Sequence, residues 1–234
     1  MTHVLYIVGT PIGNLEDISP RALAVLSEVG CIVSENPIRT RRLLSRYEIR
    51  TPMIRFTDAY ERKKTERLQA VLEALGRSDV ALVSEAGMPL VADPGYELVQ
   101  AVLEQGVQVI PVPGPSAATA ALAVSGLPPL PSCFLGFPPR RSTARRALFR
   151  SFAGDERTVV VYESPRRLVG MLEDAQAELG DRQVAVCCEL TKLYEETWHG
   201  MLSTAVVHFR ENAPRGEYVV VFGGAMPEDD ADAE

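Results

Sequence analysis

Short apolar runs alternate with longer amphipathic stretches along the chain, and this alternation predicts an α/β fold. Val, Ile and Cys dominate the apolar runs, which show little polar alternation, so we expect strands covered on both faces. The strands are expected at His3–Val8, Gly30–Ser34, Asp79–Ser84, Val107–Val112, Ser132–Phe137, Thr158–Glu163, Gln183–Glu189 and Glu217–Phe222. The helices are expected at Ser19–Glu28, Arg39–Arg46, Tyr60–Leu75, Tyr96–Glu104, Ser116–Val124, Thr143–Phe152, Pro165–Leu179 and Ser203–Phe209.

A proline-rich break in composition divides the chain. It runs from Gly126 to Pro131 and predicts an N-terminal α/β domain over residues 1–125 and a C-terminal α/β domain over residues 126–226. Residues 227–234 are acidic and lack apolar periodicity, so we expect a disordered tail.

Length and composition exclude several classes of protein. The chain has 234 residues, of which 46% are hydrophobic and 24% charged, which is typical of a globular protein and not of a disordered one. No apolar run approaches the roughly 20 residues that span a bilayer, and the N-terminus resembles a core strand rather than a signal peptide. Four cysteines without a C-x-x-C pair and three scattered histidines predict reduced thiols, no metal site and a cytoplasmic location.

The charge is unevenly distributed. The net charge is −7, but five of the 31 acidic residues lie in the tail, which leaves 26 acidic against 24 basic residues in the body. Arginines concentrate in two clusters: Arg39, Arg41, Arg42, Arg46, Arg50 and Arg55, and then Arg140, Arg141, Arg145, Arg146 and Arg150. Guanidinium groups bind phosphates bidentately, so both clusters are candidates for a nucleic-acid backbone. Solvated helix faces explain them equally well.

Three glycine- and proline-rich loops follow expected strands of the first half. They are Val8–Asn14, Ser84–Gly95 and Pro111–Ala121. Open α/β sheets bind ligands at the carboxyl ends of their strands, and glycines let the main chain approach a ligand, so the loops predict one cleft. Ser84 or Asp93 can meet the polar atoms of a ligand; alternatively, Asp93 caps the helix that starts near Gly95.

The run Leu5–Asp17 (LYIVGTPIGNLED) resembles the opening of the tetrapyrrole-methylase-like S-adenosylmethionine methyltransferases. It is most similar to the branch that methylates a cytidine ribose 2′-hydroxyl in 16S ribosomal RNA. Further similar segments follow in family order over nearly the whole chain: Ala81–Gly95, Pro111–Leu122, Tyr162–Leu168, Cys188–Glu196 and Arg215–Val219.

The resemblance implies two α/β domains of the tetrapyrrole methylase type with the cofactor cleft between them. It also implies a homodimer, S-adenosylmethionine as cofactor, and ribosomal RNA or the small ribosomal subunit as partner. Matching the motifs residue by residue implies cofactor contacts at Ile12, Met88, Val91, Ser116, Ala117, Tyr162, Leu190 and Gly216.

The same motifs imply candidate catalytic residues. Methyl transfer to a ribose hydroxyl is an in-line displacement that is helped by a base near the hydroxyl. Glu35, Glu163 and Glu189 stand at family-like positions for that base, with Lys192 and Arg166 as phosphate or oxyanion partners. Each glutamate has an alternative role in an ion pair at the surface or a dimer interface.

The chain also departs from the family pattern. Glu35-Asn36-Pro37-Ile38 stands where the family has Glu-Asp-Thr-Arg, and Ser84-Glu85-Ala86-Gly87-Met88-Pro89 stands for Ser-Asp-Ala-Gly-Thr-Pro. The acidic tail replaces a small helical extension usual in the ribosomal RNA enzymes. Two alternatives to RNA methylation therefore stay open: a catalytically impaired S-adenosylmethionine-binding paralogue, and methylation of a small tetrapyrrole-like substrate.

Overall fold

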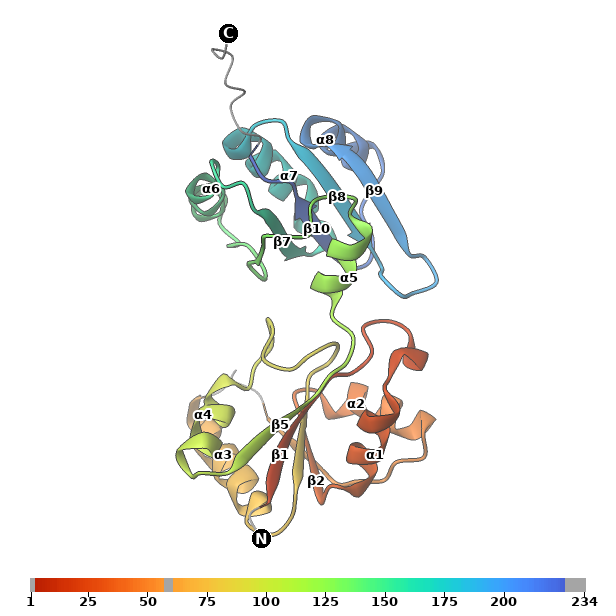
Figure 1. Ribbon diagram of the computed structural model, residues 1–234, viewed down its shortest axis with the longest axis vertical. Helices are drawn as coiled ribbons and strands as arrows, with labels where there is room; N and C mark the ends of the chain where they lie inside the picture. Colours follow the sequence, from red (N-terminus) through yellow and green to blue (C-terminus); the bar gives the residue numbers. More distant parts are fainter. Residues whose placement is uncertain (1–2, 57–60, 226–234) are drawn as a thin grey trace. The chain divides into compact units, whose positions relative to one another are not determined.

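The computed structural model describes residues 3–56 and 61–225 and divides into two compact units after Ser116 (Figure 1). Each unit is built on one five-stranded sheet with helices, which confirms the expected α/β class. The division lies one helix before the expected boundary at residue 125, because α5 (Ala117–Val124) packs on strands of the second unit. The expected tail, residues 227–234, lies outside the described residues.

The sheet of the first unit is entirely parallel. Its order is β3 (Met53–Arg55), β2 (Cys31–Ser34), β4 (Val80–Val83), β1 (Val4–Val8) and β5 (Gln108–Val112). The central strand β1 places Tyr6 opposite Ala81 on one side and Ile110 on the other. The loops that follow β1, β2, β4 and β5 therefore leave the sheet at one edge.

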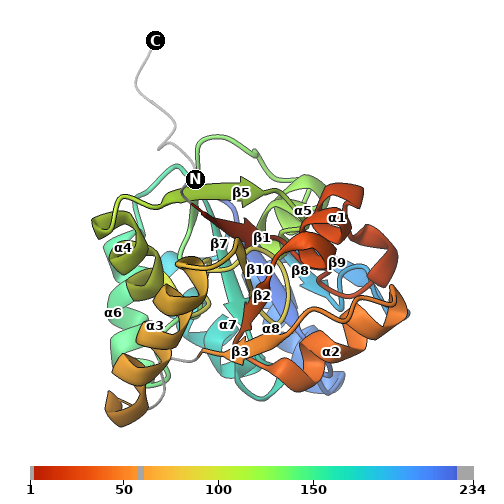
Figure 2. The ribbon, with the colours of Figure 1, turned by 90° about the horizontal axis from the view of Figure 1, so that it is seen from below.

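Helices cover both faces of this sheet (Figure 2). They are α1 (Pro20–Glu28) and α2 (Pro37–Arg46) on one face, and α3 (Glu61–Leu75) and α4 (Tyr96–Glu104) on the other. Along β4, Val80 and Leu82 join the apolar cluster of α3 and α4, while Ala81 and Val83 join that of α1 and α2. This alternation explains why the strands are apolar throughout, as the sequence predicted.

The second unit has a mixed sheet. Its order is β6 (Ser132–Phe134), β7 (Thr158–Glu163), β10 (Tyr218–Phe222), β8 (Gln183–Cys188) and β9 (Glu196–Met201). Only the β6–β7 pair is parallel. Its main core lies under α6 (Ser142–Ser151), α7 (Pro165–Leu179) and α8 (Leu202–Glu211), with Phe149, Met171 and Phe222 fully buried. The helix α5 packs against β7 and β10 and contributes no residue to that core.

Several local features differ from the expected elements. Both strands that the hydrophobic pattern missed, β3 and β9, lie at sheet edges, and β9 reads Glu-Thr-Trp-His-Gly-Met with much exposed surface. The 3₁₀ turn η1 (Leu15–Asp17) was also not expected. The helix α2 begins at Pro37, two residues early, because the Asn36 Oδ1 accepts from the Arg39 N–H at 3.4 Å. Among the described residues, no helix is both long and apolar enough to cross a membrane.

Candidate functional site

Main-chain hydrogen bonds join the loops after β1, β4 and β5. Thr10 N–H donates to the Gly87 carbonyl at 2.9 Å, and Gly87 N–H donates back to Thr10 at 3.0 Å. Gly9 N–H donates to the Val112 carbonyl of β5 at 3.0 Å. The three loops that the sequence grouped at one sheet edge are therefore connected there.

Glycine is required where these loops meet. A Cβ built on Gly9 would lie 2.7 Å from both the Gly114 Cα and the Met88 Sδ, too close for a real contact. Gly87 has φ +79°, and a Cβ there would lie 3.5 Å from the Ile12 side chain and from the Pro115 carbonyl. The structure thus brings Ile12 and Met88, two expected cofactor contacts, around the buried main chain of Gly9 and Gly87.

The rest of the 84–95 loop holds an uncommon backbone conformation. Leu90 and Ala92 have φ 69° and 65°, in the left-handed region that costs about 1–2 kcal/mol for an ordinary residue. Val91, between them, donates its N–H to the Met88 carbonyl at 3.4 Å and is exposed. Such conformations cluster at ligand sites, which supports a binding role for this loop.

Asp93 lies half-buried in the same loop. Burial raises the pKa of the Asp93 carboxyl, a hydrogen bond with Ser84 opposes that shift, and the nearby Glu85 charge adds to it. The N-cap of α4 is Gly95, and no side chain caps that helix. The alternative role of Asp93 as the helix cap is therefore wrong.

Glu85 connects this loop to the helix that follows β2. Its Oε1 accepts from the Asn36 Nδ2 at 2.7 Å, and its Oε2 pairs with the Arg39 Nη1 at 2.5 Å. Glu35 lies half-buried between Ser34, the last residue of β2, and Asn36. The two departures from the family pattern thus meet in space, and Glu35 is held beside them at the loop edge of the sheet.

In the second unit, two loops flank the start of β10. Tyr218 lies opposite Glu163 at the end of β7 and opposite Cys188 at the end of β8. The expected site residues Tyr162, Glu163, Glu189, Leu190 and Gly216 therefore gather at one edge of the second sheet. Tyr162 packs its ring on Phe134, with centroids 4.7 Å apart, and on Phe137 at 5.5 Å.

Glu163 is an internal ion-pair partner. Its side chain is fully buried, its Oε1 accepts from the Ser164 N–H at 2.7 Å, and its Oε2 lies 3.1 Å from the Arg167 Nη2. Arg167 Nη2 also donates to the carbonyls of Pro138 and Pro139, at 2.6 and 3.2 Å. The pair fixes the loop that carries Phe137, which favours the ion-pair interpretation of Glu163 over a role as a base.

Glu189 and Lys192 form a second charged group. The Glu189 Oε1 accepts from Lys192 Nζ and from the Glu217 N–H, each at 2.8 Å, and Lys192 Nζ reaches Glu217 Oε2 at 2.8 Å. Partial burial raises the pKa of Glu189, but these donors outweigh it, and the net shift is downward. Burial likewise lowers the pKa of Lys192, and its two carboxylate partners turn the net shift upward. Both groups stay ionised at neutral pH.

The backbone of this loop is also unusual. Glu189 and Thr191 have φ 51° and 66°, and Leu190 between them is buried. Gly216 has φ +82°, and a Cβ there would lie 2.5 Å from the Glu189 side chain. Four of the five described non-glycine residues with positive φ thus lie in the two loops that the motifs singled out.

The two arginine clusters have different surroundings. Arg145 is buried against Asp174, while Arg146 and Arg150 both pair with Glu178, so these three arginines tie α6 to α7. In the first cluster, Arg39 pairs with Glu85. Arg41, Arg42, Arg46 and Arg50 are exposed, and no ion pair joins them to a side chain of residues 3–56 or 65–225. The structure thus assigns most of the second cluster to helix packing.

The sequence analysis did not predict the ion pairs that Arg39, Glu85 and Arg167 form. The spacing of Glu163 and Arg167 is i, i+4, which was an available signal for their pairing. Nothing in the sequence linked Glu85 to Asn36 or Arg39, because the partners are 49 and 46 residues apart. Ser116 and Ala117 lie on either side of the division between the units, in the segment that joins β5 to α5.

The two-unit α/β architecture is that of tetrapyrrole methyltransferases. The chain superposes on cobalt precorrin-4 methyltransferase CbiF with a TM-score of 0.69, at 17% identity over 94% of each chain. It superposes on the methyltransferase CobJ with a TM-score of 0.68, at 21% identity over 96% of this chain and 95% of that one.

The sequence comparisons define the family. The chain belongs to the tetrapyrrole (corrin/porphyrin) methylases, whose family model matches residues 4–206. A relative from Synechocystis, named ribosomal RNA small subunit methyltransferase I, is 44% identical over 97% of this chain and 81% of its own length. A relative of the same name from Thermotoga maritima is 46% identical over 94% of this chain and 98% of its own length. The expected family resemblance is confirmed.

Proposed function

We propose that the chain is an S-adenosylmethionine-dependent methyltransferase that methylates a cytidine ribose 2′-hydroxyl in 16S ribosomal RNA. The observation that carries this proposal is the near full-length similarity to relatives named ribosomal RNA small subunit methyltransferase I. The structural neighbours CbiF and CobJ are 17% and 21% identical to this chain and support the fold alone.

The residues at the loop edges fit the cofactor. S-adenosylmethionine would supply a methyl group on a positively charged sulfur. The glycines at positions 9, 87 and 114 let the loops after β1, β4 and β5 approach closely, and the half-exposed apolar side chains of Ile12 and Met88 beside them suit a nucleoside. We propose that Val91, Ser116, Ala117, Tyr162, Leu190 and Gly216 complete the set of contacts.

The three candidate bases have different surroundings. Glu163 is buried and committed to Arg167, and the lowered pKa of Glu189 makes that carboxylate a weak proton acceptor. Glu35 stands at the loop edge of the first sheet, beside the Asn36–Glu85 contact. We propose from this position that Glu35 accepts a hydrogen bond from the ribose hydroxyl, and that Glu189 and Lys192 hold the Gly216 turn in place.

The proposal is tested with methyl-labelled S-adenosylmethionine and small ribosomal subunits from a strain without the modification. A 2′-O-methyl group blocks alkaline cleavage of the next phosphodiester, so label is expected in alkali-resistant dinucleotides. Label only in alkali-sensitive products, or only in an added tetrapyrrole precursor, contradicts ribose methylation. Binding of the cofactor without any transfer would identify an impaired paralogue.

The assignment of Glu35 has a separate test. Glu35→Gln is expected to lower kcat by about 10²-fold or more while leaving the Kd for S-adenosylmethionine within a factor of two or so. Glu104→Gln, at the other end of α4, is the matched control at an exposed carboxyl. A kcat unchanged in Glu35→Gln rules out this role.

We further propose a homodimer that works in the cytoplasm, on the basis of the family resemblance and the RNA substrate. Light scattering on the purified chain is expected to give about twice the 25.6 kDa of one copy. A monomeric mass at micromolar concentration contradicts the dimer.

A further inference from the structure

Exposed arginines lie along α2 and in the segment that follows it. Helix α2 contains Arg39, Arg41, Arg42 and Arg46 and no acidic residue. Its buried residues are Thr40, Leu43 and Leu44, which turn the remaining positions toward solvent. We call Arg41, Arg42, Arg46 and Arg50 the α2 arginine surface.

The α2 arginine surface lacks the partners that neutralise other arginines of this chain. Arg145, Arg146 and Arg150 on α6 each have a carboxylate within 2.8 Å. The four guanidinium groups of the α2 arginine surface are exposed and have no ion pair with the side chains of residues 3–56 and 65–225. Keeping like charges together in the folded protein is unfavourable, and binding an anion relieves that repulsion.

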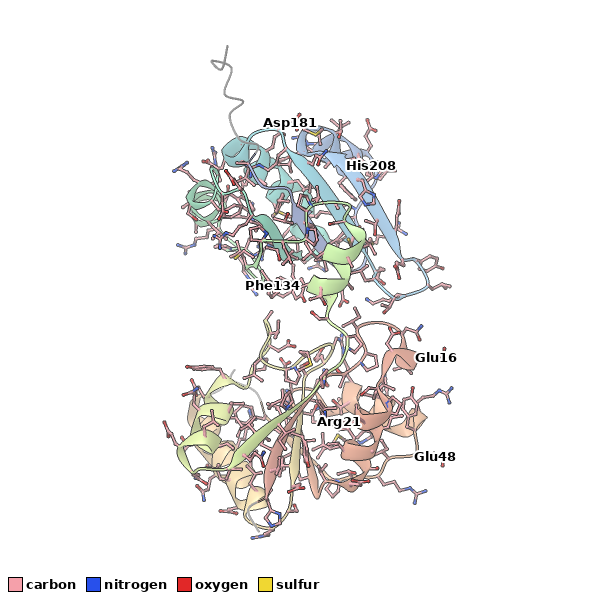
Figure 3. All side chains as sticks on the ribbon, in the orientation of Figure 1. Glu16, Arg21, Glu48, Phe134, Asp181 and His208 are labelled. Atoms are coloured by element: carbon pink, nitrogen blue, oxygen red, sulfur yellow. The ribbon has the colours of Figure 1, made fainter. Side chains whose placement is uncertain are left out.

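Acidic residues lie close to one end of the α2 arginine surface. Glu48 follows α2, and Tyr47 OH donates to the Leu15 carbonyl at 2.7 Å, which brings the neighbouring Glu16 and Asp17 close to the end of the helix. Figure 3 shows Glu16 and Glu48 on the side of the first unit that α1 and α2 form. These carboxylates lie nearer to the end of α2 that carries Arg46 than to Arg41 and Arg42, so we expect the positive potential to be strongest at Arg41 and Arg42.

The position of α2 connects this surface to the candidate site. A helix that follows a parallel strand begins at the carboxyl edge of the sheet, and the first turn of α2 is held there by Glu85. Arg41 and Arg42 therefore lie within about two helical turns of the loop edge. Guanidinium groups spaced along a helix fit the phosphates of a nucleic-acid strand, which repeat every few ångströms.

We infer that Arg41 and Arg42 bind the phosphate backbone of the ribosomal RNA substrate beside the methylation site, whereas the α6 arginines serve helix packing. This inference rests on the proposed RNA substrate. It assigns a positioning role, because phosphate contacts fix the register of an RNA without reading its bases.

The test compares Arg41→Gln/Arg42→Gln with Arg146→Gln/Arg150→Gln, which removes the same charge from the paired cluster. Binding to 16S ribosomal RNA is measured at several salt concentrations. The first variant is expected to lower the slope of log K against log salt by about 1.5 and the affinity roughly tenfold near 0.1 M salt, whereas the control changes the slope by less than half as much. Arg41→Lys/Arg42→Lys retains the charges and should keep most of the slope, which separates a charge effect from misfolding.

The outcomes separate this inference from the proposed function. Equal slopes in the two glutamine variants overturn the inference even if the wild-type chain transfers methyl groups normally. A second experiment measures binding of the same variants to vesicles that contain anionic lipid. If Arg41→Gln/Arg42→Gln loses vesicle binding while its salt slope for RNA is unchanged, the inference of an RNA contact is overturned. The Kd for S-adenosylmethionine, measured by calorimetry, should be the same in all variants. Absence of methyl transfer by the wild-type chain would count against the proposed function alone.

Discussion

Asn36 and Glu85 are direct hydrogen-bond partners, with Nδ2 and Oε1 2.7 Å apart, although 49 residues separate them in the chain. Each stands where the family resemblance implies an aspartate. The amide at position 36 donates to the longer acid at position 85, so the two replacements form a new polar pair rather than two separate losses. The pair joins the loop after β4 to the N-terminus of α2.

Glu85→Ala is expected to weaken S-adenosylmethionine binding several-fold with little effect on stability. The Arg39 side chain is 62% exposed, so the ion pair contributes about 1 kcal/mol or less to folding. The 84–95 loop, however, loses its connection to α2. Calorimetry gives the Kd and thermal unfolding gives the stability.

Arg39→Ala is the control for that variant, because it removes the ion pair and leaves the Asn36–Glu85 hydrogen bond in place. A Kd that is unchanged in Glu85→Ala would show that the loop keeps its conformation without the connection.

Gly9→Ala is expected to destabilise the first unit by about 1–3 kcal/mol, because the new Cβ would lie 2.7 Å from Gly114 main-chain atoms. Urea unfolding measures the loss. Gly154→Ala is the matched control, since a Cβ there meets nothing within 4 Å. Equal urea midpoints for Gly9→Ala and Gly154→Ala would mean that the loops after β1 and β5 can move apart without loss of folding free energy.

Asp174→Asn is expected to cost about 3 kcal/mol of folding free energy. It leaves Arg145 charged and buried, with 9% of its side chain exposed. The neighbouring Glu173→Gln breaks an exposed pair with Arg210 and should cost about 1 kcal/mol or less. Similar losses in the two variants would contradict a structural role for the α6 arginine cluster.

The Glu189–Lys192 pair predicts a defined pH dependence. A carboxyl whose pKa is lowered by folding stabilises the protein above its unfolded pKa of about 4.3, and this contribution is lost as pH falls through the folded value. A lysine whose pKa is raised stabilises the protein below its unfolded pKa of about 10.4 and loses that effect as pH rises through the folded value.

Lys192→Met should therefore lower the melting temperature by a constant amount between about pH 5 and pH 9. The difference from the wild-type chain should shrink below about pH 4, as Glu189 becomes protonated. Thermal unfolding across this range provides the measurement. A difference that is as large at pH 3 as at pH 7 would exclude the ion pair as its cause.

The fold was predictable wherever burial imposes a hydrophobic pattern. The run Val80–Val83 is buried on both faces, and its sequence shows this directly. The strand β9 was not predictable, because an edge strand with polar, exposed positions carries no such signal. The antiparallel pairing of β10 was equally hidden, since a strand covered on both faces has the same composition in either direction.

The candidate site was predictable as a set of loops and not as a set of contacts. Glycines and prolines at strand ends identified the loops around Ile12 and Met88. The partners of Glu163 and Glu189 depend on where β7, β8 and β10 bring distant segments together, and no single segment specifies that arrangement.

The contact between Gly9 and Gly114 consists of main-chain atoms alone, so it contains no group that gains or loses a proton and no charge that ions can screen. The joint between the loops after β1 and β5 should therefore keep its geometry across acidic, alkaline and saline conditions. The link through Glu85 and Arg39, by contrast, weakens as ions accumulate around it. Within one group of loops, the connection at Gly9 and Gly114 should thus be independent of pH and salt, whereas the connection through Glu85 and Arg39 should depend on salt.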